Sequence, residues 1–257
     1  MLNYIKSELY RVVRSKGIYI LTGGCSALLL AMNLVLYFAG RGDTFFPYDS
    51  TEFAFSMVAD SFPVILILTL CLASVIFSDE YKNRTLMNSI AYGYPRIGLF
   101  LGKVVVGMLV SFLALAVALG FFIGSAYLLL ENSGAETLHM LLRGVLVNIP
   151  ILIAGELAAY VMLFLMEKGA ATWAWLGLIA FFPMICSLLG MKFEIFSKIN
   201  SWLLYTVAGA SFMNETGHYT MAYMTRDGAF RCLASGTIGI VIFLIIGMRG
   251  MSKKEFK

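Results

Sequence analysis

One acidic side chain, Glu156, lies in the middle of a long apolar run of the sequence. A charged group at the depth of a bilayer centre is costly, so a residue of this kind favours a functional interpretation. Its carboxylate could line a translocation path, bind a cationic group of a substrate or carry a proton. A lone carboxyl can equally be protonated or hydrogen-bonded and serve only to fix the packing of helices. The sequence leaves both interpretations open.

A second group of polar residues lies between two apolar runs, from Asp79 to Lys103. Acidic residues come first and basic residues follow, an order that suits the dipole of a short helix beginning near Asp79. Gly93 and Pro95 should end that helix. Lys103 should then extend its ammonium group to the membrane surface at the start of the next apolar run. The pattern predicts a charged surface helix over residues 79–97.

The motifs of several enzyme classes are absent from the sequence. No glycine-rich loop ends in Gly-Lys-Ser or Gly-Lys-Thr, so the chain lacks a P-loop for nucleotide phosphates. His139 and His218 have no second ligand at metal-binding spacing, and neither His-Glu-x-x-His nor Gly-x-Ser-x-Gly occurs. We therefore expect no enzyme activity, no metal and no cofactor in this chain, and any ATP-driven motor must be another polypeptide.

The composition indicates which class of protein must position these residues. Of the 257 residues, 60% are hydrophobic and only 13% are charged, whereas soluble domains have about 45–50% apolar and about 25% charged residues. One soluble core cannot hide so much apolar surface. A soluble enzyme, a disordered chain and a disulfide-stapled secreted domain are therefore excluded, and we expect an all-α integral membrane protein.

Six apolar runs are long enough to cross a bilayer, because a core of about 30 Å takes about 20 helical residues. Residues 2–16 place apolar side chains at helical spacing among basic ones and predict an interfacial amphipathic helix. Residues 199–213 are apolar but too short to cross, so we expect a re-entrant or interfacial helix in the last outer segment. The six predicted transmembrane helices are 17–39, 61–78, 104–130, 144–166, 169–191 and 232–248.

The positive residues give an expected orientation. With six spans, 13 of the 19 Lys and Arg residues lie on the side of the membrane that holds both termini. Because Lys and Arg favour the cytoplasmic side, both termini are expected in the cytoplasm of a multi-pass cell-membrane protein. Four basic residues in the last outer segment weaken this bias and favour an alternative with seven spans, in which residues 199–213 cross the membrane.

The charged loop between the second and third predicted spans resembles the first cytoplasmic loop of ABC-2 type transporter permeases. The resemblance is to an exporter branch whose loop reads roughly Lys-Asn-Gly-Thr, then Asn, then Gly and Arg, and whose members export bacteriocins or other antimicrobial peptides or give immunity to them. Arg84 stands where this branch usually has glycine, so the local backbone turn should differ. The predicted topology is similar over the whole chain. The matching residues are Glu80, Lys82, Asn83, Thr85, Asn88, Gly93, Arg96 and Lys103.

The resemblance implies that residues 79–97 form a cytoplasmic coupling helix, which docks on a separate ATPase subunit. It implies a homodimer of this chain in membrane lipid with two copies of the ATPase, which bind the ATP and Mg, and no nucleic acid partner. The implied function is export of amphipathic peptides from a bacterial cell. The alternatives are an intramembrane enzyme that uses Glu156 and an ATP-independent channel or sensor component. The implied coupling residues are Asp79, Glu80, Lys82, Asn83, Arg84, Thr85, Asn88 and Arg96.

Overall fold

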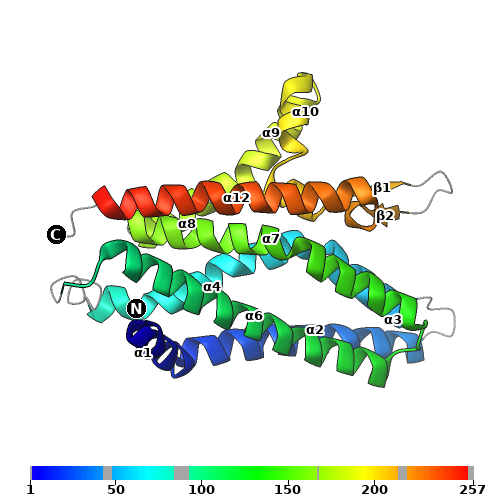
Figure 1. Ribbon diagram of the computed structural model, residues 1–257. Coiled ribbons are helices and arrows are strands. Elements are labelled where there is room, and N and C mark those ends of the chain that lie inside the picture. Colours follow the sequence, from blue (N-terminus) through cyan, green and yellow to red (C-terminus); the bar gives the residue numbers. More distant parts are fainter. Residues whose placement is uncertain (1, 43–47, 84–92, 167, 214–218, 254–257) are drawn as a thin grey trace.

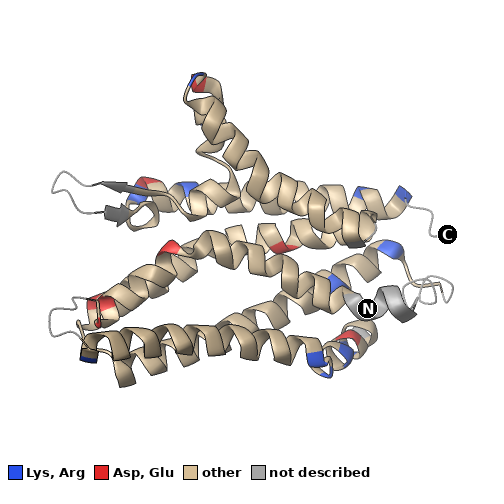
Figure 2. Cartoon of the chain, turned by 180° about the vertical axis from the view of Figure 1, so that it is seen from behind, with Lys and Arg blue, Asp and Glu red and all other residues tan. Residues whose placement is uncertain are grey.

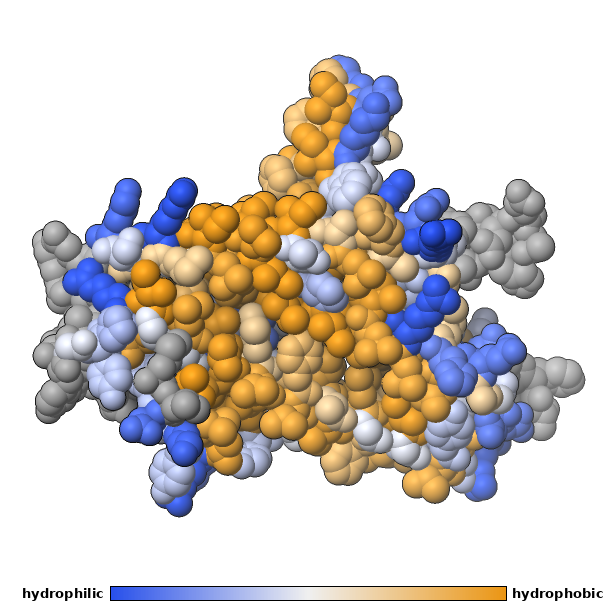
Figure 3. Space-filling model, in the orientation of Figure 1, coloured by the Kyte–Doolittle hydropathy of each residue, from blue (hydrophilic) through white to orange (hydrophobic). Residues whose placement is uncertain are grey.

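The computed structural model describes residues 2–42, 48–83, 93–166, 168–213 and 219–253. Five of its helices are long and apolar enough to cross a membrane, and a bent pair of helices makes a sixth span if it is counted as one. On the face of the molecule that Figure 3 shows, a broad apolar belt lies between two hydrophilic ends. These features confirm the expected all-α integral membrane fold.

Four long helices run the length of the bundle (Figure 1). They extend beyond the predicted spans, because hydropathy marks only the apolar part of a helix, whereas its backbone hydrogen bonds continue to the next helix-breaking residue. Pro95 directly precedes the helix of the third predicted span, and Gly134, with a φ of 104°, directly precedes the helix of the fourth. The long helices are α2 (Lys16–Gly42), α6 (Arg96–Leu129), α7 (Ala135–Leu165) and α12 (Arg226–Lys253).

The fifth span consists of three helical segments, α8 (Lys168–Leu176), the π-helical η1 (Gly177–Phe181) and α9 (Phe182–Gly190). Pro183 lies in the first turn of α9 and has no backbone N–H to donate to the preceding turn. The wider turn of η1 lies directly before it, with the N–H of Phe182 donating to the carbonyl of Gly177. The sequence predicts this span at 169–191 but not its π-helical turn.

The chain is bent at the start of the predicted second span. A helix that the sequence does not predict, α3 (Thr51–Asp60), meets α4 (Phe62–Asn83) at 59°. The side chain of Ser50 caps α3 by accepting a hydrogen bond from the N–H of Phe53 at 3.3 Å. The acidic residues near the two ends of α3 lower its hydropathy, which explains why the sequence predicts the second span only from residue 61.

The long helices form two pairs. In one pair, α12 packs along α7, and a Cβ atom on Gly236 would lie 2.6 Å from the backbone at Pro150 and Ile151, so only glycine allows this approach. In the other pair, α2 packs along α6, and α1 (Leu2–Val13) packs beside the start of α6. Helix α4 packs mainly on α7.

Helices α6 and α7 touch directly over the first half of α6. The rings of Phe100 and Phe164 have centroids 5.3 Å apart, and the hydroxyl of Tyr160 lies against Gly107. Further along, α3 packs between the two helices, and its Phe55 contacts Phe122 of α6 edge-on, with centroids 5.7 Å apart. The two helices therefore diverge away from the first half of α6.

Both chain ends lie at one end of the bundle, which we call the termini end, and the strands β1 (Ser211–Met213) and β2 (Tyr219–Met221) lie at the other, the hairpin end (Figure 1). The two strands pair antiparallel. Charged residues gather at these two ends and at the tip of an arm that projects from the bundle (Figure 2). The arm consists of α9 and α10 (Glu194–Asn200), which folds back on α9.

The prediction of one helix over residues 199–213 is wrong. The segment holds the end of α10, the short α11 (Leu204–Ala208) and β1. Ser201 ends α10 and Gly209 ends α11, and the backbone of the following residues bonds instead to β2 and to Ala222, whose N–H donates to the carbonyl of Ala210. The backbone of this segment is therefore hydrogen-bonded in a short helix and a strand pair beside α12, and not in one continuous helix.

The contact at Gly107 can be tested by adding one methyl group. A Cβ atom there would overlap the hydroxyl of Tyr160, so Gly107→Ala should destabilise the protein by about 1–3 kcal/mol and lower its thermal unfolding temperature in detergent. Gly120→Ala on the same helix is the matched control, because a Cβ at that position meets nothing within 4 Å. Equal unfolding temperatures for the two variants would contradict the α6–α7 contact.

Candidate functional site

A buried ion pair joins α1 to the start of α6 at the termini end. One carboxylate oxygen of Glu8 lies 3.0 Å from Nζ of Lys103 and 2.7 Å from Nη2 of Arg11. Lys103 is 1% exposed and Glu8 is 8% exposed. Arg11 also donates to the carbonyl of Ile76 in α4 at 3.4 Å. The charged cluster therefore connects α1, α4 and α6.

The neighbouring charges keep Glu8 ionised. Burial by itself raises the pKa of this carboxyl, but the positive charges of Lys103 and Arg11, with the hydrogen bonds that both donate, outweigh burial and lower the pKa of Glu8 below its usual value. The Lys103 ammonium also lies 5.6 Å from the centre of the Phe77 ring in α4, within reach of a cation–π contact. Glu8 is therefore an anion at neutral pH although it is buried.

Apolar contacts surround the ion pair. Val12 of α1 is buried with Ile76 of α4 and Val106 of α6 in one hydrophobic cluster. The ring of Tyr4 lies against Gly102, where a Cβ would come within 2.8 Å of it, and is 5.9 Å from the ring of Tyr94. Tyr94 directly precedes Pro95 and α6, so α1 contacts the chain at the point where the predicted coupling segment ends.

Two features of this cluster differ from the sequence interpretation. Lys103 is buried and paired, and does not extend to the membrane surface, because the carboxylate of Glu8 lies within 3.0 Å of it. Glu8 itself is missed by the sequence analysis. The available signal was its place on the apolar face of the 2–16 helix, one turn after Tyr4 and one turn before Val12, where a carboxylate needs a partner.

The predicted coupling residues are placed only in part. Helix α4 continues without a break through Asp79 to Asn83, so no separate helix begins at Asp79; no glycine or proline interrupts this stretch. Arg96 opens α6. The backbone of α4 also includes Glu80 and Lys82, whereas Arg84, Thr85 and Asn88 lie outside the described residues.

Glu156 of α7 lies against α6. It is 2% exposed, and the hydroxyl of Ser111 in α6 donates to its Oε1 at 2.7 Å. One residue before it, the carbonyl of Gly155 accepts a hydrogen bond from the indole of Trp175 at 2.9 Å. In this conformation, Glu156 therefore braces α7 against α6. Among the described residues, no group of three or more His, Cys, Asp or Glu side chains could hold a metal ion.

The apolar belt, the long helices and the buried polar links between them define a multi-pass α-helical membrane protein. The chain belongs to the ABC-2 family of transporter proteins, whose family model matches residues 4–187. It is thus a permease, the membrane component of an ABC transporter, which is not itself catalytic and associates with an ATP-binding cassette partner. The matched residues include α1 from Tyr4 onward and the whole ion-pair cluster. No curated protein that was compared with the chain matches it.

The ion pair can be tested by removing each partner. Glu8→Gln or Lys103→Met alone breaks a buried ion pair, which should cost up to about 3–5 kcal/mol and lower the unfolding temperature in detergent. The loss should be smaller for Lys103→Met, because Arg11 still contacts the carboxylate of Glu8. The double variant should recover most of that loss, because no charge of this pair then remains buried. Glu194→Gln is the control: its pair with Lys198 has both side chains exposed, so the change should be below about 1 kcal/mol. Additive losses in the double variant would contradict the pairing.

Proposed function

We propose that this permease is the membrane subunit of an ABC exporter, which forms a homodimer and is driven by two copies of a separate ATPase subunit that bind ATP and Mg. The ATPase docks at the termini end, on the segment from Asp79 to Arg96. The observation that carries this proposal is the buried pair of Glu8 and Lys103, since it fastens α1 to the helix that begins directly after this segment.

The termini end is built to transmit a displacement. The docking segment continues into α4 on one side and α6 on the other, so a push on it reaches both helices through their own backbones. The ion pair and the Tyr4 contacts with Gly102 and Tyr94 fasten α1 to the same point. ATP-driven closure of two ATPase subunits would thus move α1, α4 and α6 together. An ATP-independent channel would not need this junction.

The substrate that we propose is an amphipathic peptide, on the basis of the resemblance of the loop to that of peptide-exporting and immunity permeases. Glu156 is the candidate for the translocation path. Its bond to Ser111 holds α6 and α7 together in the conformation described above, and a shift of α6 along α7 would release the carboxylate to face a cationic substrate group. The Ser111 and Tyr160 side chains beside it are neutral and offer no second charged group for an intramembrane enzyme.

Docking can be tested by charge reversal in the loop. Glu80→Lys with Arg84→Glu should abolish co-purification of the ATPase subunit and the stimulation of its ATP hydrolysis, while the permease still folds. The matched control is Glu194→Lys with Lys198→Glu, which reverses an exposed ion pair on the arm and should leave both measurements unchanged. Undiminished co-purification of the ATPase subunit and undiminished stimulation of its ATP hydrolysis in the loop variant would contradict the docking proposal.

The role of Glu156 can be tested with Glu156→Gln, which keeps the size of the side chain and an oxygen that accepts from Ser111. The unfolding temperature should stay within a few degrees, whereas the stimulation of the complex by a synthetic cationic amphipathic peptide should fall at least about tenfold, the equivalent of about 1.4 kcal/mol. Stimulation equal to that of the unaltered complex would reduce Glu156 to a packing residue.

A further inference from the structure

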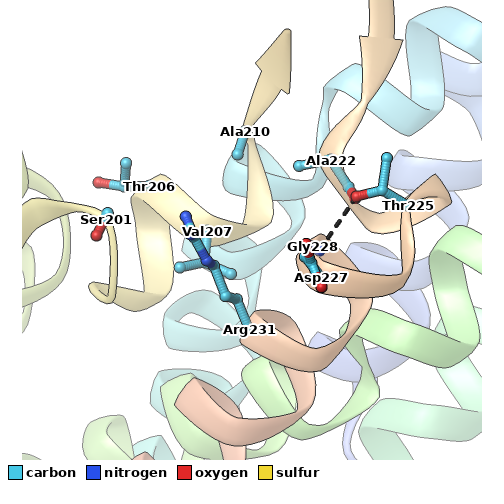
Figure 4. Close-up of a pocket in the computed structure, with 9 residues that line it drawn as sticks. All are labelled: Ser201, Thr206, Val207, Ala210, Ala222, Thr225, Asp227, Gly228 and Arg231. Carbon is cyan, nitrogen blue, oxygen red and sulfur yellow. Dashed lines mark hydrogen bonds between the residues drawn. The ribbon is translucent and has the colours of Figure 1, made fainter.

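A pocket lies at the hairpin end, where α12 begins (Figure 4). Its volume is about 310 Å³, close to the lower limit of small-molecule sites. Its walls come from the α10–α11 turn, from α11 and from the first two turns of α12. Its polar lining consists of the side chains of Ser201, Thr206, Thr225, Asp227 and Arg231.

Local contacts fix these walls. A Cβ atom on Gly228 would overlap the carbonyl of Ala222, so glycine allows the short helix η2 (Ala222–Met224) to press against the first turn of α12. Thr225 accepts a hydrogen bond from the N–H of Gly228 at 3.1 Å and donates to that carbonyl at 2.7 Å. On the other wall, the hydroxyl of Ser235 donates to the carbonyl of Trp202 at 2.6 Å. These hydrogen bonds hold the walls of the pocket in place without involving the side chains of Asp227 and Arg231.

The two charged side chains of the pocket, Asp227 and Arg231, are available to a ligand. Asp227 and Arg231 are four residues apart on α12, so they lie on one face of the helix. Both are exposed, and within the part of the chain that the structure describes neither forms an ion pair or a side-chain hydrogen bond. The pocket thus presents one anion and one cation, which matches a guest that carries one charge of each sign.

The position of the pocket at the edge of the apolar belt favours a lipid as its ligand. Arg231 directly precedes the apolar run that begins at Cys232, which places the guanidinium at the edge of the apolar belt, where headgroups lie. Along the same face of α12 follow Ile238, Ile242 and Ile245, which are 53%, 47% and 41% exposed. An apolar track for an acyl chain therefore leads away from the charged pocket.

We propose that this pocket binds phosphatidylethanolamine, with the phosphate on Arg231, the ammonium on Asp227 and an acyl chain along Ile238 and Ile242. The quaternary ammonium of phosphatidylcholine has no N–H to donate to Asp227, and the net negative charge of phosphatidylglycerol is repelled by this carboxylate. The bound lipid would hold the α10–α11 turn against the start of the last span.

The test is native mass spectrometry of the permease with equimolar phosphatidylethanolamine, phosphatidylcholine and phosphatidylglycerol. The protein should retain phosphatidylethanolamine preferentially, and Arg231→Ala should lower its retention about tenfold. Asp227→Asn should shift the preference toward phosphatidylglycerol. Arg226→Ala, one residue outside the pocket, is the matched control and should retain the lipids as the unaltered protein does.

Equal retention of the three lipids by the unaltered protein means non-specific annular lipid only and overturns the proposal. The same holds if both pocket variants keep the original preference. Asp227→Asn alone decides the question if Arg231→Ala does not fold. The measurement involves no ATPase subunit, so its outcome is independent of the proposed exporter function.

Discussion

Desolvation of the Glu8–Lys103 pair is the constraint on which the termini end depends. A surface ion pair contributes little to stability, but here the ammonium is 1% exposed and the carboxylate residue 8% exposed. Removing either partner breaks a buried ion pair, which costs more than the pair contributes in place. Helix α1 is therefore fixed to α6 far more firmly than an amphipathic helix held only by lipid. Arg11 extends this connection to the backbone of α4.

Hydrogen bonds between buried neutral groups also join helices along the bundle. Asn33 of α2 is fully buried and donates to the carbonyl of Phe122 and to the hydroxyl of Ser125, both in α6. The indole of Trp175 in α8 donates to the backbone of α7. Apolar contact alone does not distinguish a neighbouring helix from lipid, so each such bond, together with close approaches at small residues, specifies which helices meet.

The spans could be predicted because each is a nearly uninterrupted apolar run, and a bilayer leaves such a run few alternatives to a helix. Helix α3 escaped prediction because Glu52 and Asp60 interrupt its apolar pattern. The ion pair escaped because its partners are 95 residues apart in the chain, and one sequence carries no signal for that contact. Glu156 could be singled out by its depth, whereas its partner Ser111 is one of several serines in the apolar runs and required the three-dimensional structure.

The divergence of α6 and α7 beyond Ser111 has a mechanical consequence. At about 1.5 Å per residue, Ser111 lies about 22 Å from the start of α6 at Arg96 and about 27 Å from its end at Leu129. If α6 tilts about this contact with α7, its two ends move in opposite directions by similar distances. A lateral push of a few ångströms at the termini end then becomes an opposite movement of similar size at the hairpin end. Helix α6 would thus pivot at the Ser111–Glu156 hydrogen bond, and its second half packs against α3.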